Sequence, residues 1–579
     1  MKIDKIALFF CLISISILTF WYYPKWNKSG SEATLSWDSS GYYWYLPAVF
    51  IYHDLKQLTF SQDILQKYQP TPEFQQAYVH PSGNYVLKYS SGQAIMMFPG
   101  FISGHLAAKV LKYPQDGFSP PYQFGIFIWG WIMCLFGIYM LYKVLRIHFS
   151  AMSTAITLLV IVFGTNYLEY GGITNTMTHN YLFTYYACLI YVTDRFYNNP
   201  SILWSICIGA ILGIMVLTRP TEILAVIIPL LYGLNFSLND VVQRIKFIGV
   251  NIAKYLLAIA LFIGIGSIQL FYWKYVSGEW LVYSYEDQGF SWLHPHMFEG
   301  FFSATGWMVY SPLVILFIPG IFALWYQKRN LAPTFTLFII LFIYVTFAWD
   351  IWWYGGSVGQ RALVQMYPVL AFPIAAFVGI FKKVSVFAIL GTLLMTLGIH
   401  YNFWVIHQAH KGGMLFAGFM TRPYLMAILL RDKMPDGALN LMDTRYNYQG
   451  ILQNPKILLA QDSMRKECIS GDIQYSQVQK VTLEQNGGWL RISANFVIKE
   501  KEWDTWKMTQ LIVRYKHGED HLGDDVLRVQ RHFDGGSKNL YLDSKIRVGA
   551  DTAEIFLWNA DGRKELCMEN LEIVYHTGD

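Results

Sequence analysis

The sequence predicts a polytopic α-helical membrane protein of about eleven transmembrane helices, followed by a water-facing antiparallel β-sandwich domain at the C-terminus. Two observations carry this prediction. Hydrophobic residues make up 54% of the 579 residues and charged residues only 14%, which leaves too few charges for the surface of a soluble protein of this length. After about residue 430 the long apolar runs stop, and short runs of alternating polar and apolar residues replace them.

Eleven apolar segments approach the length of about 20 residues that a helix needs to cross a bilayer. The first follows Lys2 and Lys5 and lacks a small-residue cleavage site, so it is predicted to be an uncleaved helix and not a signal peptide. The segments lie near residues 6–23, 121–142, 151–168, 179–194, 202–218, 220–235, 247–271, 302–326, 331–349, 362–381 and 384–405.

The apolar run 94–111 decides the predicted topology, because its crossing would change the side of every later loop. If it does not cross, the short outer loops carry only Arg219, Lys274 and Arg361, whereas eleven lysines and arginines fall on the cytoplasmic side. Positive residues concentrate on the cytoplasmic side, so the run is predicted to lie at the membrane surface, within a long first outer loop over 24–120. The N-terminus then faces the cytoplasm and the C-terminal domain the outside. The eleven are Lys2, Lys5, Lys143, Arg146, Arg195, Arg244, Lys246, Lys328, Arg329, Lys382 and Lys383.

The C-terminal region shows the pattern of a β-sandwich. Alternating runs such as Trp489–Ile498 and Leu511–Tyr515 are separated by turns rich in Gly, Asn and Asp. Its Trp and Tyr residues either stack on sugar rings or belong to the core. Cys468 and Cys567 flank this domain and are expected to form a disulfide if it faces an oxidising compartment. The predicted parts are a membrane domain over 1–405, an interfacial helix and linker over 406–474, and the sandwich over 475–579.

Composition excludes some classes of function. The net charge of +5 is modest, and the chain has no basic run and no Gly-rich phosphate loop, which argues against a nucleic-acid-binding protein. No Cys/His cluster has the spacing of a metal site. The aromatic content of 17% suits a membrane interface.

A candidate catalytic carboxylate, Asp38, stands just beyond the first apolar segment. Next to aromatic residues such as Tyr42, it is placed to take a proton from an acceptor hydroxyl at the membrane surface, with Tyr42 as a substrate contact. The alternative is that Asp38 caps a helix beginning near Ser39. Asp54 and Glu73 are other carboxylates of the same loop that are available for the role.

Three cations are candidate ligands of a lipid phosphate: Arg361, Lys88 and, more weakly, Arg219. Arg361 ends a Gly-rich aromatic segment that starts at Trp349, and glycines let a ligand approach the backbone closely. A guanidinium at the start of a span can clamp a phosphate through two hydrogen bonds. Alternatively, each cation only anchors its segment at the interface. The substrate contacts expected from the Gly-rich segment are Asp350, Gly356 and Gln360.

Two further outer loops hold candidate substrate contacts. The loop 169–180 is rich in hydrogen-bonding groups and ends in His179 and Asn180. The loop 272–300 contains Glu286. Sugar hydroxyls are bound by such groups, but an ordinary capped turn uses the same residue types.

In their order along the chain, these motifs resemble the GT-C superfamily of membrane glycosyltransferases, especially the bacterial relatives of protein O-mannosyltransferases and of the lipid A aminoarabinose transferase. The resemblance covers roughly residues 1–405 and is carried by Asp38, Lys88–Gly92, Ser119–Gln123 and Gly355–Arg361. It implies transfer of a sugar, with inversion, from a polyprenyl-phosphate donor. The implied acceptor is a hydroxyl or phosphate of a protein, lipid or polysaccharide on the outer face of the bacterial cytoplasmic membrane.

The resemblance also implies roles for individual residues. Asp38 matches the catalytic carboxylate that acts as general base, and Arg361 and Lys88 match positions expected to hold the lipid phosphate. Many relatives have an Asp-Glu pair in this loop, whereas Ser39 follows Asp38. A divalent metal therefore stays open but is not supported by a paired carboxylate, and no other cofactor is expected. Two other functions stay open: a transporter or flippase of lipid-linked sugars, and a non-catalytic glycan-binding membrane protein.

Overall fold

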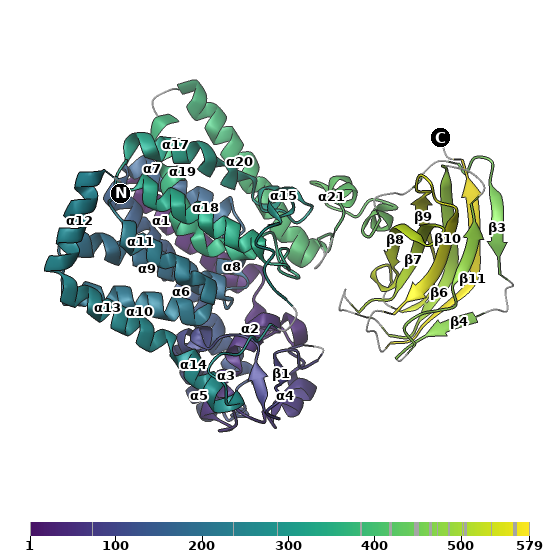
Figure 1. Ribbon diagram of the computed structural model, residues 1–579, viewed down its shortest axis with the longest axis horizontal. Helices are drawn as coiled ribbons and strands as arrows, with labels where there is room; N and C mark the ends of the chain where they lie inside the picture. Colours follow the sequence, from purple (N-terminus) through teal and green to yellow (C-terminus); the bar gives the residue numbers. More distant parts are fainter. Residues whose placement is uncertain are drawn as a thin grey trace. The chain divides into compact units, whose positions relative to one another are not determined.

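The computed structural model forms two compact units, each with its own core (Figure 1). The first unit comprises Met1–Phe302 and Gly306–His410, and the second comprises Lys411–Asp579 with Ser303–Thr305. Helices build the first unit and strands dominate the second. The structure describes residues 2–71, 73–235, 237–285, 288–381, 385–415, 420–444, 448, 451–461, 466–471, 473–483, 487–500, 502, 507–533, 535–559 and 564–577.

The first unit is a bundle of helices interrupted by short 3₁₀ segments. Its α-helices are α1 (Ile3–Ile17), α2 (Trp37–Tyr43), α3 (Tyr45–Phe50), α4 (Ser61–Tyr68), α5 (Gly92–Leu111), α6 (Pro120–His148), α7 (Ala151–Phe163), α8 (Tyr167–Gly172), α9 (Thr178–Asn198), α10 (Ile202–Thr218), α11 (Ile227–Leu231), α12 (Leu238–Val250), α13 (Ile252–Gly266), α14 (Ile268–Ser277), α15 (Met297–Phe302), α16 (Trp307–Tyr310), α17 (Phe317–Gln327), α18 (Ala332–Ala348), α19 (Tyr367–Phe381) and α20 (Ser385–His407). Its main 3₁₀ segments are η4 (Pro220–Val226), η5 (Pro312–Leu316) and η6 (Arg361–Met366).

The prediction of about eleven transmembrane helices is not confirmed. Among the described residues, six helical segments are long and apolar enough to cross a membrane, or seven if one pair bent by 101° forms a single span. Four further apolar helices are shorter. Proline explains part of this difference: Pro312 begins a 3₁₀ segment inside the run 302–326, which was predicted to be one span. The six segments are Ile3–Asn27, Gly92–Leu111, Pro120–His148, Ile252–Ser277, Arg361–Ile380 and Ala388–Gly412, and the bent pair is Met297–Tyr310 with Pro312–Gln327.

Helix α5, which was predicted to lie at the membrane surface, is one of these six segments. It packs along the N-terminal part of α6. A Cβ added at Gly104 would lie 2.8 Å from the Cα atom of Tyr122, and the indole of Trp129 donates to the carbonyl of Met96 at 2.7 Å. Helix α5 therefore has the length and hydropathy of a membrane span, and its placement at the membrane surface stays a prediction.

The chain between α1 and α6 is a folded layer and not an open loop. It contains α2 to α5 and a hairpin of β1 (Ala77–Val79) and β2 (Tyr85–Leu87), which gather with α14 at one end of the helical unit (Figure 1). Trp44, Phe118 and Tyr122 are fully buried in its core. The hydroxyl of Tyr43 donates to the carbonyl of Gly117 at 2.6 Å. This core fixes the backbone on which Asp38 and Lys88 stand.

The second unit contains a sandwich of two antiparallel sheets, as predicted. The four-stranded sheet has the order β5-β10-β7-β8, and the other has the order β3-β11-β6-β9, with β4 also paired to β11. Apolar side chains of both sheets share one core, and in β6 buried residues alternate with half-buried ones. The strands are β3 (Lys456–Ala460), β4 (Lys466–Ile469), β5 (Gln479–Thr482), β6 (Trp489–Ile498), β7 (Gln510–His517), β8 (Asp520–Arg528), β9 (Gly536–Lys545), β10 (Thr552–Trp558) and β11 (Leu566–His576), preceded by α21 (Arg422–Ile428).

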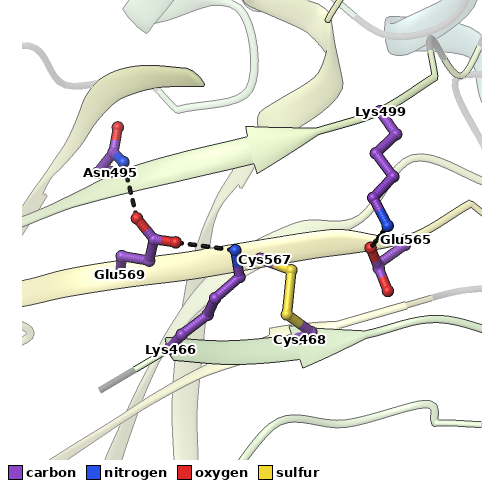
Figure 2. Close-up of a disulfide and its surroundings, with 7 residues drawn as sticks. All are labelled: Lys466, Cys468, Asn495, Lys499, Glu565, Cys567 and Glu569. Atoms are coloured by element: carbon purple, nitrogen blue, oxygen red, sulfur yellow. Dashed lines mark hydrogen bonds and ion pairs between the residues drawn. A yellow bond between two sulfur atoms is a disulfide. The ribbon is translucent and has the colours of Figure 1, made fainter. Parts of the chain in front are cut away.

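The sandwich begins earlier than the predicted residue 475. Strands β3 and β4 lie inside the segment predicted to be a linker, and both pair with β11, the last strand of the chain. Cys468 of β4 stands opposite Cys567 of β11, and the two are joined by a disulfide (Figure 2). Next to it, Lys466 and Glu569 form an ion pair of 3.0 Å across the same strands. These contacts attach the short β4 to the sheet.

Candidate functional site

Asp38 and Arg361, which are 323 residues apart in the chain, form an ion pair. Asp38 lies in the first turn of α2. One of its carboxylate oxygens accepts from the guanidinium of Arg361 at 2.5 Å, and the other accepts from the hydroxyl of Tyr89 at 2.7 Å. Helix α2 begins before Ser39, and the side chain of its first flanking residue, Ser36, makes no capping bond. The carboxylate of Asp38 thus faces a cation that is distant in the sequence, and it does not act as a helix cap.

The backbone around Arg361 is shaped by the Gly-rich segment before it. Gly359 has a φ of +68°, a left-handed conformation that favours glycine, and a Cβ there would lie 3.0 Å from Tyr310. The neighbouring Val358 is held from both sides, because its N–H donates to the hydroxyl of Tyr170 and its carbonyl accepts from Asn166, each at 3.0 Å. These contacts fix the point at which η6 begins and hence the position of the guanidinium.

The ion pair controls the protonation of Asp38. Burial acts to raise the pKa of its carboxyl, but Arg361, the hydroxyl of Tyr89 and the charge of Lys88 together lower that pKa below its usual value. The side chain of Asp38 remains 25% exposed and that of Arg361 21% exposed. The carboxylate is therefore ionised at neutral pH, and both charged groups can be reached from outside the protein.

Tyrosine rings surround the pair. Tyr42 packs on Tyr89 with ring centroids 4.4 Å apart, and Tyr285 meets Tyr89 edge-on at 6.3 Å. The ammonium of Lys88 lies 5.6 Å from the centre of the Tyr285 ring. Burial and the Asp38 carboxylate raise the pKa of Tyr89 well above its usual value, so its hydroxyl stays protonated and donates to the aspartate. Aromatic faces of this kind can stack on a sugar ring.

A second guanidinium, that of Arg219, belongs to the same surroundings. Arg219 follows the last residue of α10. Burial raises the pKa of the Tyr42 hydroxyl, and the positive charges of Arg219 and Arg361 both act to lower it. Its guanidinium donates to the side-chain oxygen of Gln365 at 3.4 Å, and that oxygen also lies 2.9 Å from Nδ1 of His179. The structure therefore brings together the predicted residues Asp38, Arg361, Lys88, Tyr42, Arg219 and His179.

Other predicted substrate contacts have structural partners instead. Both hydrogens of the Asn180 amide donate to carbonyls, those of Gly130 at 2.8 Å and Asn175 at 2.7 Å. This side chain joins α9 to α6 and does not point donors at a ligand.

The carboxylate of Asp350 accepts from the N–H of Gly289 at 3.0 Å and from the hydroxyl of Ser291 at 2.7 Å. It ties the Gly-rich segment to the preceding loop. Gly356 is exposed, and Gln360 is fully buried beside Arg361. Glu286 lies outside the described residues.

Asp54, another carboxylate of the first loop, has a role of its own. Asp54 closes a turn of its own, because it accepts from the N–H groups of Gln57 and Thr59, each at 2.8 Å. Around Asp38 the nearest polar groups are a guanidinium and a phenol, which do not fit a divalent cation. Within the described part of the chain, no three His, Cys, Asp or Glu residues are grouped so that they could hold a metal.

Two residues of this region were missed as individual candidates from sequence. Tyr89 stands beside Lys88 in the quoted motif but carries no signal that its hydroxyl reaches Asp38. Gln365 follows Arg361 by four residues, and an amide within an apolar segment is itself an indication of a polar contact.

Fold and site together define a multi-pass membrane protein whose loops converge on a carboxylate held between a guanidinium and a phenol. Residues 121–268, about a quarter of the chain, match the family model of dolichyl-phosphate-mannose-protein mannosyltransferase. This match confirms the predicted resemblance to that branch of the GT-C membrane glycosyltransferases. The matched segment contains His179 and Arg219 but ends before Arg361 and begins after Asp38.

Two other comparisons, with curated proteins and with solved structures, do not identify a function. No curated protein matches the chain. Among solved structures, the oligosaccharyltransferase of Archaeoglobus fulgidus in its apo form is similar at 13% sequence identity, with a TM-score of 0.40. The similarity covers 78% of this chain and 62% of that one, so the present chain spans about 62% of the length of that structure.

Proposed function

We propose that the protein is a GT-C-type glycosyltransferase that moves a sugar from a polyprenyl-phosphate donor to an acceptor hydroxyl or phosphate. The observation that supports this proposal most is the contact between Asp38 and Arg361. It places a group that can take a proton beside a group that can hold a phosphate. The family match supports a lipid-linked sugar as donor.

The chemistry follows from these two groups. The acceptor oxygen attacks the anomeric carbon, the bond from that carbon to the phosphate oxygen breaks, and polyprenyl phosphate leaves with inversion. The acceptor proton passes to the carboxylate of Asp38, which is ionised and therefore able to receive it. The leaving phosphate gains negative charge, and the guanidinium of Arg361 stabilises that charge, with Lys88 and Arg219 as further cations nearby.

In the structure, the proposed base and the proposed phosphate ligand contact each other. Both oxygens of Asp38 are occupied, by Arg361 and by Tyr89. A donor phosphate that binds Arg361 takes over the guanidinium hydrogen bonds and leaves one oxygen of Asp38 for the acceptor. Binding of the donor is therefore proposed to prepare the base.

The proposed location is the bacterial cytoplasmic membrane, with the N-terminus in the cytoplasm and the reacting loops and β-sandwich outside. Charge distribution supports this orientation. The disulfide between Cys468 and Cys567 supports an oxidising compartment for the sandwich. The acceptor is proposed to be a protein, a lipid or a polysaccharide.

A test uses the purified protein in lipid with a panel of polyprenyl-phosphate sugars, and measures the release of polyprenyl phosphate. We expect release by the wild type with at least one donor and a loss of about 10²- to 10⁴-fold in Asp38→Asn, the range attributed to a positioned general base. Asp54→Asn is the matched control, because this carboxylate of the same loop closes a local turn. Full release by Asp38→Asn would contradict the proposal, as would flipping of the donor without any release.

A further inference from the structure

A buried network of side chains lies behind the two arginines, and Gln365 stands at its centre. Its side-chain oxygen accepts from Arg219 at 3.4 Å and lies 2.9 Å from Nδ1 of His179. Its side-chain nitrogen donates to Glu222. The second oxygen of Glu222 accepts from the hydroxyl of Tyr186 at 2.5 Å. Gln365 and Glu222 are both almost fully buried.

The orientation of the Gln365 amide follows from the charges at its two ends. A guanidinium has only donors, so the amide oxygen must face Arg219. A carboxylate accepts, so the amide nitrogen must face Glu222. It follows that His179 donates from Nδ1 to the same oxygen. The amide thus connects the guanidinium of Arg219 to the carboxyl group of Glu222.

Without this connector, Arg219 and Glu222 would be within reach of each other. They are three residues apart in one 3₁₀ turn, and the N–H of Glu222 donates to the carbonyl of Arg219 at 2.9 Å. A guanidinium and a carboxylate at this spacing pair readily, and inside a protein such pairing is strongly favoured over leaving both charges apart. In the structure their contact runs through Gln365 instead, and the guanidinium reaches toward Tyr354, to which it donates a hydrogen bond.

We infer that Gln365 is a positioning residue that keeps Arg219 from pairing with Glu222, so that this guanidinium stays available to the donor phosphate. The inference rests on the proposed function, because it gives Arg219 a phosphate to bind. Gln365 also stands on η6, the 3₁₀ segment that begins with Arg361. The same segment therefore carries one phosphate-binding guanidinium and sets the direction of the other.

The inference predicts a rescue that a purely structural role would not give. The measurement is the dissociation constant of undecaprenyl phosphate for the full-length protein in lipid nanodiscs. We expect Arg219→Ala and Gln365→Ala each to weaken binding about tenfold, the size of one charged contact. Glu222→Gln alone should bind within about threefold of wild type, since the connector remains. In Gln365→Ala combined with Glu222→Gln, the carboxyl group that would pair with Arg219 is absent, and binding should return to within about threefold of wild type.

Two further variants distinguish loss of the connector from a general folding defect. Gln365→Asn keeps the amide but shortens its reach, and it should weaken binding in the same direction as the alanine variant. Asn402→Ala removes another buried amide, which donates to the carbonyls of Phe163 and Thr165 at 2.8 Å, and it should leave binding unchanged in folded protein.

The outcomes separate the two claims. If Gln365→Ala binds normally, or if Glu222→Gln fails to rescue it while Arg219→Ala is impaired, the positioning role is wrong and the proposed function stands. If the wild type does not bind undecaprenyl phosphate, both are wrong.

Discussion

Replacing Arg361 by glutamine tests the paired site most severely. The change keeps a polar side chain but removes the cation that contacts Asp38 at 2.5 Å. The two side chains are 25% and 21% exposed. Exposed pairs contribute about 0.2–1 kcal/mol, whereas breaking a buried pair costs about 3–5 kcal/mol, so we expect Arg361→Gln to cost about 2 kcal/mol of stability. The loss in turnover should be larger, about 10²- to 10³-fold, because a preorganised donor to the developing phosphate charge is removed.

The same variant should change the pH dependence of the reaction. In the wild type, burial acts to raise the pKa of Asp38, and Arg361, Tyr89 and Lys88 more than offset it. Because the folded pKa lies below the unfolded value of about 3.9, the ionised carboxylate stabilises the fold above about pH 4. That contribution is lost as the pH falls through the lowered pKa. Without Arg361 the raising effect of burial is less opposed, so the acid limb of kcat/KM should move to higher pH.

The assay is the pH profile of polyprenyl phosphate release, read as kcat/KM, which reports groups of the free enzyme. Lys274→Gln is the control: this lysine also lies at the end of a helix, but it donates to the carbonyl of Gly278 and should leave the acid limb in place. The reasoning is refuted if Arg361→Gln keeps more than about a tenth of wild-type turnover, far above the expected loss. It is refuted equally if its acid limb coincides with that of the wild type.

Three further changes have defined expectations. Tyr89→Phe removes the 2.7 Å hydrogen bond to the catalytic aspartate; turnover should fall about tenfold, with the acid limb of kcat/KM shifted to higher pH, and an unchanged profile would contradict this role. Replacing Cys468 and Cys567 by serine should destabilise the sandwich by about 2–4 kcal/mol, measured by thermal unfolding with and without reductant; a wild type insensitive to reductant would argue against the bridge. Gly104→Ala places a Cβ 2.8 Å from the backbone of α6 and should cost about 1–3 kcal/mol, whereas Gly264→Ala, which meets nothing within 4 Å, should be tolerated in the same melting experiment.

Much of the architecture could be predicted because hydropathy and period-two alternation are local properties. The alternation over 489–498 correctly predicted β6. The loss of long apolar runs after about residue 430 falls inside the second unit, which begins at Lys411. Helix breaks were less accessible. The chain breaks at Pro312, where η5 begins, inside the segment 302–326 that was predicted to be one span. Strands β3 and β4 also escaped, because short edge strands are recognised mainly through the partner strand β11, which lies about 100 residues later.

The candidate site could be predicted in part because charged residues beside apolar segments are rare and stand out. Asp38 and Arg361 were selected separately on that basis, and the structure places them in contact. The same signal selected Asp350 and Asn180, which make contacts inside the protein: Asp350 accepts from Gly289 and Ser291, and the Asn180 amide nitrogen donates to Gly130 and Asn175. Sequence shows that a polar group is present, but only the fold shows whether a carbonyl or a ligand satisfies it.

The most direct test of the central claim is a structure of the full-length protein with undecaprenyl phosphate bound. The claim predicts that the phosphate lies within hydrogen-bond distance of the Arg361 guanidinium and that the contact between Arg361 and Asp38 lengthens as the phosphate replaces one carboxylate oxygen. A phosphate bound elsewhere, with that ion pair intact, would contradict the account.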